Sequence, residues 1–312
     1  MLTTTKKILR QAEKFGYAVG AFNVNDLEVI EAVLEAALAE HSPVIIQTSE
    51  GAIEYAGMHA LGGAVHGLAL YTPKYANLPI AFHLDHGKNP ELVKEAIKSG
   101  WYTSVMIDAS GHTFAENVEI TRDIVLEARH YGISVEAELG SIAGIEDFVS
   151  VKDQDAHLTD SKQTRAFIRE TGCDSLAVAI GTSHGAYKYK GDPKLDLERL
   201  QKIKKMVGHT PLVLHGASCV PEELRKKCTA LGCVLKDAQG VSDDLIKKAI
   251  KAGINKVNID TDLRLAFTVG VREALAKDPT NIDPRKILGP AKKLITELVR
   301  KKMRLLGSSG KA

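Results

Sequence analysis

The chain has 312 residues, of which 44% are hydrophobic, and its 41 lysines and arginines nearly balance 39 aspartates and glutamates, giving a formal net charge of +2. A charge so close to zero provides no global field for nucleic acid or a membrane surface, so neither is expected as a partner. No apolar stretch approaches the ~18 uncharged residues of a membrane span, and no signal peptide opens the sequence, so a cytoplasmic protein is expected.

The four cysteines, Cys173, Cys219, Cys228 and Cys233, form no C-x-x-C pair. Four cysteines in a chain of this length are sparse for a disulfide scaffold. We therefore expect free thiols in a reducing compartment.

Short apolar runs rich in β-branched residues alternate along the chain with longer segments of helical period. The expected strands are residues 17–24, 43–49, 78–84, 103–108, 134–139, 175–180, 211–215 and 256–259. The expected helices are residues 27–40, 90–99, 115–131, 161–171, 197–207, 222–231 and 243–252. Pro90 and Pro221 suit a first helical turn, and glycines such as Gly172 suit the helix ends.

Eight strand-then-helix units predict a parallel sheet, and eight strands are the number that closes a barrel. The alternative is a doubly wound open sheet, which has a glycine-rich phosphate turn after its first strand. Residues 23–26, Asn-Val-Asn-Asp, are not such a turn. We therefore predict an α/β fold, a single (β/α)8 TIM barrel forming one domain over residues 1–312.

Two segments exceed the minimal barrel unit. Residues 141–160 form a long connection after the fifth strand, which we expect to be a mobile loop over the site, with a disordered surface loop as the alternative. Residues 284–306 are expected to form a C-terminal helix that packs on the barrel or on a neighbouring subunit.

Three of the eight strand ends carry a histidine followed by glycine: His86, His184 and His215. Catalytic groups of such barrels lie at the C-terminal ends of strands. Imidazole is a favoured ligand of catalytic zinc, and three protein ligands leave one position open for substrate. One histidine would more often be an ordinary buried residue, but three in this pattern predict a metal site.

Asp85 precedes the first of these histidines. Adjacent strand residues face opposite ways, so Asp85 and His86 both reach the site only if the strand ends there, as Gly87 permits. The carboxyl group is suited to proton transfer, or alternatively to orienting a histidine. His83 shares the parity of Asp85 and is expected to pack or support rather than bind metal.

A phosphate site is expected after the later strands. Lys188 lies four residues beyond His184, and Ser218 and Thr261 follow the seventh and eighth strands, where this architecture usually binds phosphate. Lys188 could equally be a solvated loop lysine.

These motifs make the sequence resemble the class II, metal-dependent fructose-1,6-bisphosphate aldolases along nearly its whole length. The most specific blocks are residues 83–87 (HLDHG), 179–188 (AIGTSHGAYK), 214–218 (LHGAS) and 258–264 (NIDTDLR). The compact length and the position of Arg264 resemble the shorter subgroup, which also contains tagatose-bisphosphate aldolases.

The resemblance implies roles for individual residues. The three histidines would hold Zn²⁺, with other divalent metals also compatible, and Asp108 and Glu138 would line alternative metal positions. Asp85 would exchange a proton with the C4 hydroxyl, and Glu146 in the long loop would move a proton on dihydroxyacetone phosphate. The implied substrate contacts are Gly185, Lys188, Gly216, Ser218, Asp260 and Thr261 for the C1 phosphate, Asn258 for ketose hydroxyls, Arg264 for the distal phosphate, and Asn23 and Ser49 as further polar lining. A monovalent cation, Na⁺ or K⁺, is implied beside the C1 phosphate.

Many relatives have glycine at the position of Cys219, and cysteine is expected to stiffen this phosphate turn.

The implied activity is the reversible cleavage of fructose 1,6-bisphosphate to dihydroxyacetone phosphate and glyceraldehyde 3-phosphate, a step of glycolysis and gluconeogenesis. A homo-oligomer, dimer or tetramer, is expected.

The same chemistry on tagatose 1,6-bisphosphate stays open as the alternative. A Schiff-base aldolase needs a lysine near the barrel centre, and Lys256 begins its predicted strand, so no lysine suits. A non-enzymatic sugar-phosphate sensor would leave the three histidines unexplained.

Overall fold

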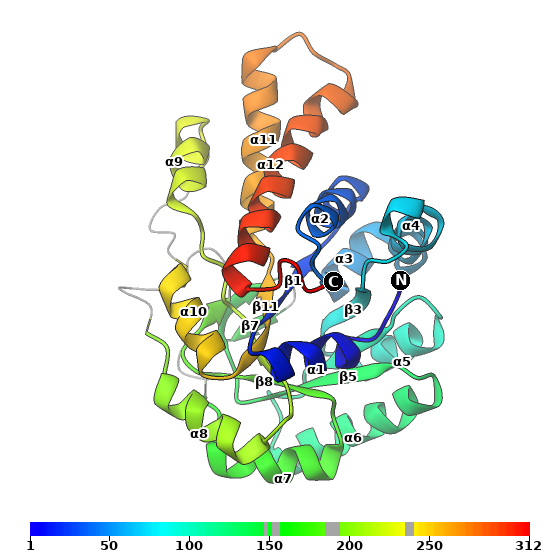
Figure 1. Cartoon of the computed structure of the whole chain (residues 1–312), viewed down its shortest axis with the longest axis vertical. Helices are drawn as coiled ribbons and strands as arrows, with labels where there is room; N and C mark the ends of the chain where they lie inside the picture. The colour runs from blue at the N-terminus through cyan, green and yellow to red at the C-terminus, as the bar shows by residue number, and fades with distance from the viewer. Residues whose placement is uncertain (147–148, 152–156, 185–193, 235–239) are drawn as a thin grey trace.

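The computed structural model describes residues 1–312 apart from 147–148, 152–156, 185–193 and 235–239, and the side chains of 143–146, 149–151 and 184 also lie outside the description. Eight strands close a parallel barrel in the order β1-β11-β10-β8-β5-β4-β3-β2 (Figure 1). Their bounds are β1 Val19–Asn23, β2 Val44–Thr48, β3 Ile80–Gly87, β4 Ser104–Ile107, β5 Ser134–Leu139, β8 Ser175–Val178, β10 Leu212–Leu214 and β11 Ile254–Ile259. The predicted TIM barrel is confirmed.

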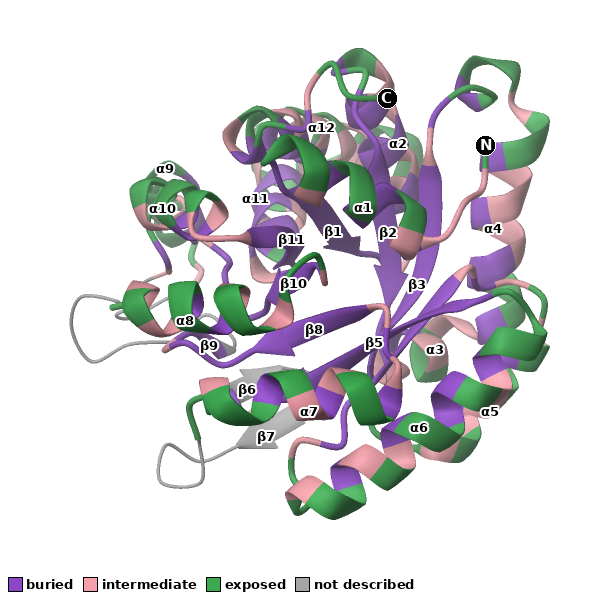
Figure 2. Ribbon diagram, turned by 60° about the horizontal axis from the view of Figure 1, so that its bottom comes forward, coloured by how far each residue is buried: buried purple, intermediate pink, exposed green. Residues whose placement is uncertain are grey.

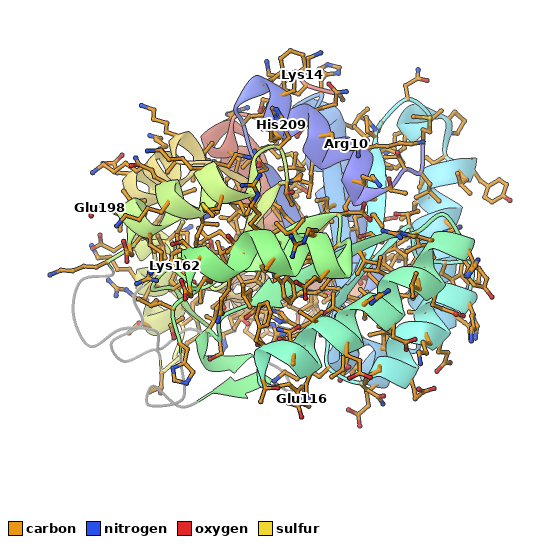
Figure 3. All side chains as sticks on the ribbon, turned by 90° about the horizontal axis from the view of Figure 1, so that it is seen from below. Arg10, Lys14, Glu116, Lys162, Glu198 and His209 are labelled. Carbon is orange, nitrogen blue, oxygen red and sulfur yellow. A yellow bond between two sulfur atoms is a disulfide. The ribbon has the colours of Figure 1, made fainter. Side chains whose placement is uncertain are left out.

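All seven helices expected between strands are present. They are α2 Leu27–Ala39, α5 Pro90–Lys98, α6 Phe114–His130, α7 Ser161–Thr171, α8 Leu197–Val207, α9 Glu222–Ala230 and α10 Asp243–Lys251. Their ends follow the expected chemistry: Pro90 opens α5 behind the N-cap Asn89, and Gly172 closes α7 in the left-handed conformation. The charged side chains labelled on these helices in Figure 3, such as Glu116 and Lys162, are exposed.

The sequence pattern missed four further helices. They are α1 Thr5–Phe15, α3 Glu50–Ala56, α4 Met58–Tyr71 and α11 Thr261–Lys277, with a short 3₁₀ turn η1 at Pro73–Tyr75. Helix α4 contains three glycines, which weaken its helical signal. At Gly62 the reason is packing, since an added Cβ would lie 2.5 Å from the Trp101 ring.

The apolar interior is divided by the barrel wall. Strand residues that face outward, such as Phe22 and Phe82, pack under the helices in the main core. Inward residues near the strand starts, including Val19 and Ile45, pack with Ile8 and Leu9 of α1, which closes that end of the barrel. Figure 2 shows the strands of the barrel as buried. Polar contacts also occur at this end, where Thr5 Oγ1 of α1 lies 2.7 Å from Ser104 Oγ and 2.8 Å from Ser134 Oγ.

The segment after β5 contains regular structure. Strands β6 Ala143–Glu146 and β7 Val149–Val151 pair antiparallel, and β6 also pairs in parallel with β9 Ser183–His184. The alternative of a disordered surface loop is therefore wrong for these residues. The expected mobility of the segment 141–160 stays a prediction.

The C-terminal residues form helix α12 Pro284–Leu306, as predicted. It packs along α11 and α2 (Figure 1). Arg300 and Arg304 both contact Glu40, and Lys302 reaches inward to Asp262. Among the described parts of the chain, no helix has the length and apolar character needed to cross a membrane.

The expectation of four free thiols is wrong for one pair. Cys228 and Cys233 form a disulfide, with their Cα atoms 5.1 Å apart, whereas Cys173 and Cys219 are free. Cys228 lies in the last turn of α9, and the chain reverses through Gly232 so that Cys233 N–H donates to Cys228 O at 2.8 Å. This local turn joins two cysteines whose spacing matches no common motif.

Candidate active site

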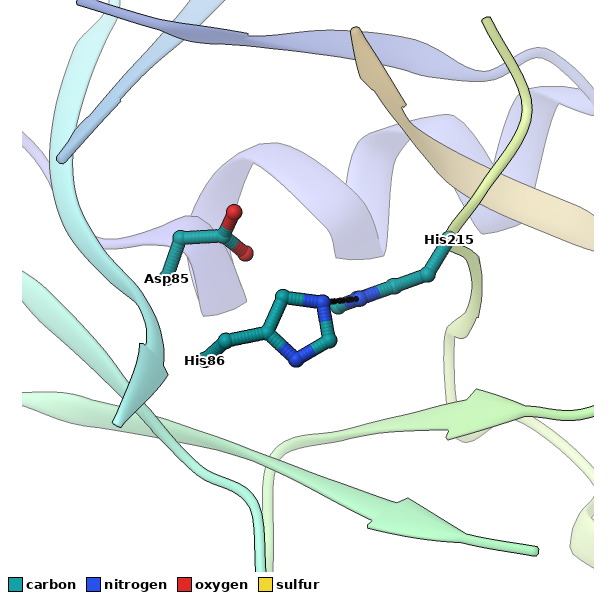
Figure 4. A group of neighbouring side chains, drawn as sticks. All are labelled: Asp85, His86 and His215. Atoms are coloured by element: carbon teal, nitrogen blue, oxygen red, sulfur yellow. Dashed lines mark hydrogen bonds between the residues drawn. The ribbon is translucent and has the colours of Figure 1, made fainter. Parts of the chain in front are cut away.

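Asp85 and His86, though consecutive, both point into the mouth of the barrel (Figure 4). The sequence predicts that the strand ends at Asp85 and His86. Instead, β3 continues to Gly87, with a register shift against β4. His86 has a positive φ of 47°, which is uncommon for a residue with a side chain. Gly87 is required, because a Cβ there would lie 2.6 Å from Met106 O. The local irregularity turns two neighbouring side chains to the same side.

His86 meets His215, which follows β10, at the centre of the mouth. His215 Nδ1 lies 2.6 Å from His86 Nε2, with the two rings nearly perpendicular, and both residues are buried. The third predicted ligand, His184, has its backbone in β9 opposite Gly144 of β6. Its side chain lies outside the described residues, so two of the three predicted ligands are brought together here.

Two carboxylates approach the same histidines. Asp108 Oδ2 lies 3.4 Å from His86 Nδ1, and Glu138 Oε2 lies 3.9 Å from His215 Nδ1. Ligand atoms of Asp85, His86 and His215 all lie within 4.8 Å of one another, and so do those of His86, Asp108 and Glu138. Glu138 Oε2 is buried and has no hydrogen-bond donor among the described residues. Imidazole nitrogens with an unsatisfied buried carboxylate oxygen fit a divalent cation.

The electrostatics of this cluster favour positive charge. Burial by itself would lower the pKa of His86, but the charge of Asp85 and the hydrogen bond with Asp108 raise it to about 10. Burial, followed by the nearby charge of Asp108, raises the pKa of Glu138 well above its usual range. A cation at this position would therefore be stabilised by acidic groups that are costly to bury alone.

Asp85 is held by three carboxamides. Its Oδ2 accepts from Asn23 Nδ2 at 3.0 Å and from Gln47 Nε2 at 3.1 Å, and its Oδ1 accepts from Asn258 Nδ2 at 2.8 Å. Asn23 and Asn258 were predicted site residues, whereas Gln47 was not. Gln47 reaches Asp85 because β1 and β2 pair in a register that sets Asn23 opposite Gln47, and only the structure reveals this register.

A second layer of buried polar groups lies below His215. His215 Nε2 is 2.7 Å from Glu136 Oε1, and Glu136 Oε2 is 2.9 Å from Lys256 Nζ. His83 Nδ1 contacts Ser104 Oγ at 2.7 Å, and burial with the charge of Lys256 lowers the pKa of His83 well below its usual value. His83 is therefore neutral and supports the interior, as expected.

Lys256 corrects one argument from sequence. It does not begin its strand but is third in β11, and it points into the barrel interior. Position alone therefore does not exclude a Schiff-base lysine. Its environment argues against that role, because Lys256 is 0% exposed and its Nζ donates to Glu136 Oε2 at 2.9 Å.

Four of the predicted phosphate residues are described, and they follow β10 and β11: Gly216, Ser218, Asp260 and Thr261. Gly216 has a φ of 60° and lies so close to Ser183 that a Cβ would be 2.7 Å from its carbonyl oxygen. Ser218 is buried two residues later, and Thr261 opens α11 after Asp260. Gly185 and Lys188 lie outside the described residues, as does the side chain of Glu146, whose backbone is in β6.

Arg264 lies beside a cavity of about 720 Å³ at the rim. Its guanidinium contacts both carboxylate oxygens of Asp260, with Nε 2.8 Å from Oδ1 and Nη2 2.8 Å from Oδ2. Asn23 lines the same cavity, which thus extends from the Asp85 cluster to Arg264. Ser49 caps helix α3 by accepting from Ala52 N–H at 3.2 Å.

Comparison with known proteins places the chain in a family. The family described as class-II fructose-bisphosphate aldolase matches residues 3–311. The chain is 52% identical over 312 residues to the fructose-bisphosphate aldolase of Thermus caldophilus and 48% identical over 311 residues to that of Helicobacter pylori, in both cases covering 100% of each chain. Among solved structures, the YdjI aldolase from Escherichia coli K12 matches with a TM-score of 0.78 and 31% identity over 100% of both chains.

Proposed function

The chain belongs to the class II fructose-bisphosphate aldolase family, and from that premise we propose that it catalyses the reversible, zinc-dependent cleavage of fructose 1,6-bisphosphate. The products would be dihydroxyacetone phosphate and glyceraldehyde 3-phosphate. The observation that carries this proposal is a buried carboxylate, Asp85, next to two histidines in contact with each other at the barrel mouth. Residues 1–312 would form one catalytic domain.

His86, His184 and His215 would hold the metal, with Asp108 and Glu138 lining alternative positions. Bound there, a divalent cation supplies Lewis acidity that stabilises the negative charge developing on the ketose oxygens. The contact between His86 and His215 supports this assignment for two of the three ligands.

Asp85 would act as the base in cleavage. Its carboxylate takes the proton of the C4 hydroxyl, the C3–C4 bond breaks, and the bonding electrons move toward the C2 carbonyl. In condensation Asp85 returns the proton to the aldehyde oxygen. The amides of Asn23, Gln47 and Asn258 fix both carboxylate oxygens and so reduce the reorganisation needed at each proton transfer.

The substrate would be held by its two phosphates. The turn at Gly216 and Ser218, with Gly185, Lys188, Asp260 and Thr261, would bind the C1 phosphate beside a monovalent cation, and Arg264 would bind the distal phosphate. Asn258 Oδ1 is buried without a donor among the described residues, which supports a contact with a ketose hydroxyl. Ser49 would add polar lining, and Glu146 would move a proton on the three-carbon product.

The wider setting follows from the same proposal. A cytoplasmic homo-oligomer working in glycolysis and gluconeogenesis is the setting that fits this activity. Tagatose 1,6-bisphosphate is retained as the alternative substrate, since the orientation of one hydroxyl separates the two sugars.

The test is a cleavage assay with both hexulose bisphosphates, before and after EDTA treatment and after zinc is restored. Activity that EDTA removes and zinc restores supports the proposal, and the ratio of kcat/KM between the two sugars identifies the substrate. His184→Ala should abolish turnover. Near-normal activity of that variant, or trapping of the enzyme by borohydride with substrate, would overturn the metal-dependent mechanism.

A further inference from the structure

The turn at residues 216–220 carries two of the proposed phosphate-binding residues, and its backbone is held from behind by a buried carboxylate. Asp262 is 0% exposed. Its Oδ2 accepts from Cys219 N–H at 3.1 Å, and its Oδ1 accepts from Val220 N–H at 2.7 Å. Both amides lie directly after Ser218, so the carboxylate fixes the direction in which the turn leaves that residue.

Val220 makes such support necessary. Its φ is 46°, a left-handed conformation that a β-branched side chain rarely adopts. A strained backbone of this kind persists only where surrounding contacts hold it. The 2.7 Å hydrogen bond from Val220 N–H to Asp262 is a contact of that kind.

Lys302 holds Asp262 in turn. It projects from α12, is itself 6% exposed, and places Nζ 2.7 Å from Asp262 Oδ2. Despite burial, the charge of Lys302 and the backbone N–H donors lower the pKa of Asp262, and the charge of Asp262 raises the pKa of Lys302. The pair is therefore fully ionised and links the last helix to the rim of the barrel.

The other sides of the turn are packed by glycines. A Cβ on Gly216 would lie 2.7 Å from Ser183 O, and a Cβ on Gly240 would lie 2.2 Å from Ser218 O. Behind Cys219, in contrast, there is a cavity of about 340 Å³ that Lys302 also lines. The 216–220 turn could shift into this cavity, and the hydrogen bonds from Cys219 N–H and Val220 N–H to Asp262 oppose that shift.

We propose that Asp262 and Lys302 act as positioning residues that hold the 216–220 turn in the shape that binds the C1 phosphate of the substrate. Neither residue touches the substrate in this proposal; both act through the backbone of the turn. The inference rests on the function proposed above, because it takes Gly216 and Ser218 as phosphate-binding residues.

The test is the double variant Asp262→Asn/Lys302→Met, which removes both charges together and leaves neither one buried alone. The matched control is Lys292→Met, on the same helix, which removes the surface pair with Glu31. We expect the double variant to raise KM for the bisphosphate and the inhibition constant of inorganic phosphate by about tenfold, with kcat changed by less than about twofold. The zinc dissociation constant, measured by chelator competition, should stay unchanged.

Hydrogen exchange provides a readout independent of turnover. The Cys219 and Val220 amides should exchange faster in the double variant than in the Lys292→Met control. Unchanged KM, unchanged phosphate inhibition or unchanged amide protection in a folded double variant would overturn the proposal. If the double variant does not fold, Asp262→Glu, which keeps a negative charge beside Lys302 but moves the carboxylate oxygens relative to the Cys219 and Val220 amides, is measured in the same way.

The two proposals fail separately. If the zinc-loaded wild type cleaves no ketose bisphosphate, the proposed function fails, and the phosphate-binding part of this inference fails with it. If the wild type is active but the double variant matches its control, only the positioning role of Asp262 and Lys302 is lost.

Discussion

Glu136 Oε2 lies 2.9 Å from Lys256 Nζ at the centre of the barrel, where neither side chain is exposed. The other oxygen of Glu136 contacts His215, so the charge of a lysine on β11 is linked through one carboxylate to a proposed metal ligand after β10. Two charges are costly to bury, and each makes the burial of the other tolerable. The pair thereby supports both the fold and the orientation of His215.

Lys256→Met should destabilise the protein by about 3–5 kcal/mol, because it leaves Glu136 buried without its partner. Urea denaturation followed by circular dichroism measures this change. The double variant Lys256→Met/Glu136→Gln should recover much of the loss. If both variants were equally unstable, packing rather than charge would explain the effect.

Glu136→Gln should weaken zinc binding about 10–100-fold, since partners that orient a ligating histidine usually contribute that much. Chelator competition on the purified variant checks this directly. Glu297→Gln, which alters an exposed acid on α12, serves as the control. Equal affinity in both variants would contradict the orienting role.

Asp85→Asn should lower kcat by about 10²–10⁴-fold while zinc still binds, because the amide keeps the shape of the carboxylate but cannot take the C4 proton. Steady-state kinetics together with metal analysis separate the two effects. Asn23→Ala, which removes one of the three amides from Asp85, should cost less. A zinc-loaded Asp85→Asn enzyme of normal kcat would reassign the base.

Arg264→Ala should raise KM for the bisphosphate at least about tenfold, because a charge-assisted contact with the distal phosphate is lost. The KM for fructose 1-phosphate, which lacks that phosphate, should change little. Arg272→Ala on the same helix removes a hydrogen bond to Leu231 O and provides the comparison. An unchanged KM for the bisphosphate would remove Arg264 from the distal site.

Glu40→Gln should destabilise the protein at pH 7 but progressively less in acid. Hydrogen bonds from Arg304, and then from Arg300 and Ser309, lower the pKa of Glu40 from 4.5 to about 2. A carboxyl with a lowered pKa contributes its full stability above pH 4.5 and loses it as pH falls toward about 2. Denaturation at pH 7, 4 and 3 should show the difference from wild type narrowing, and a constant difference would contradict it.

Much of the architecture could be predicted because it repeats. The barrel follows from eight apolar runs that alternate with helical segments, and most of the expected helices begin and end within a few residues of the observed ones. Helix α3 was missed because it has only seven residues, and helix α4 because its three glycines weaken the helical signal. The disulfide was missed because a local turn, rather than a motif, brings Cys228 to Cys233.

Some residues of the candidate site could likewise be predicted from the sequence, and others could not. That Asp85, His86 and His215 lie together could be predicted from the sequence, because side chains at strand ends converge in a closed parallel barrel. Gln47, Glu136 and Lys256 could not be assigned roles, since their partners come from strands far away in the chain.

The sequence by itself determined the barrel, the family and the residues with reactive groups, because periodicity and strand-end chemistry are local properties of the chain. Only the tertiary structure decided that Asp85 and His86 share one side of an irregular strand, that three amides hold Asp85, and that Lys302 reaches Asp262. These relationships depend on register, backbone strain and the burial of charge, which arise only when distant segments pack together.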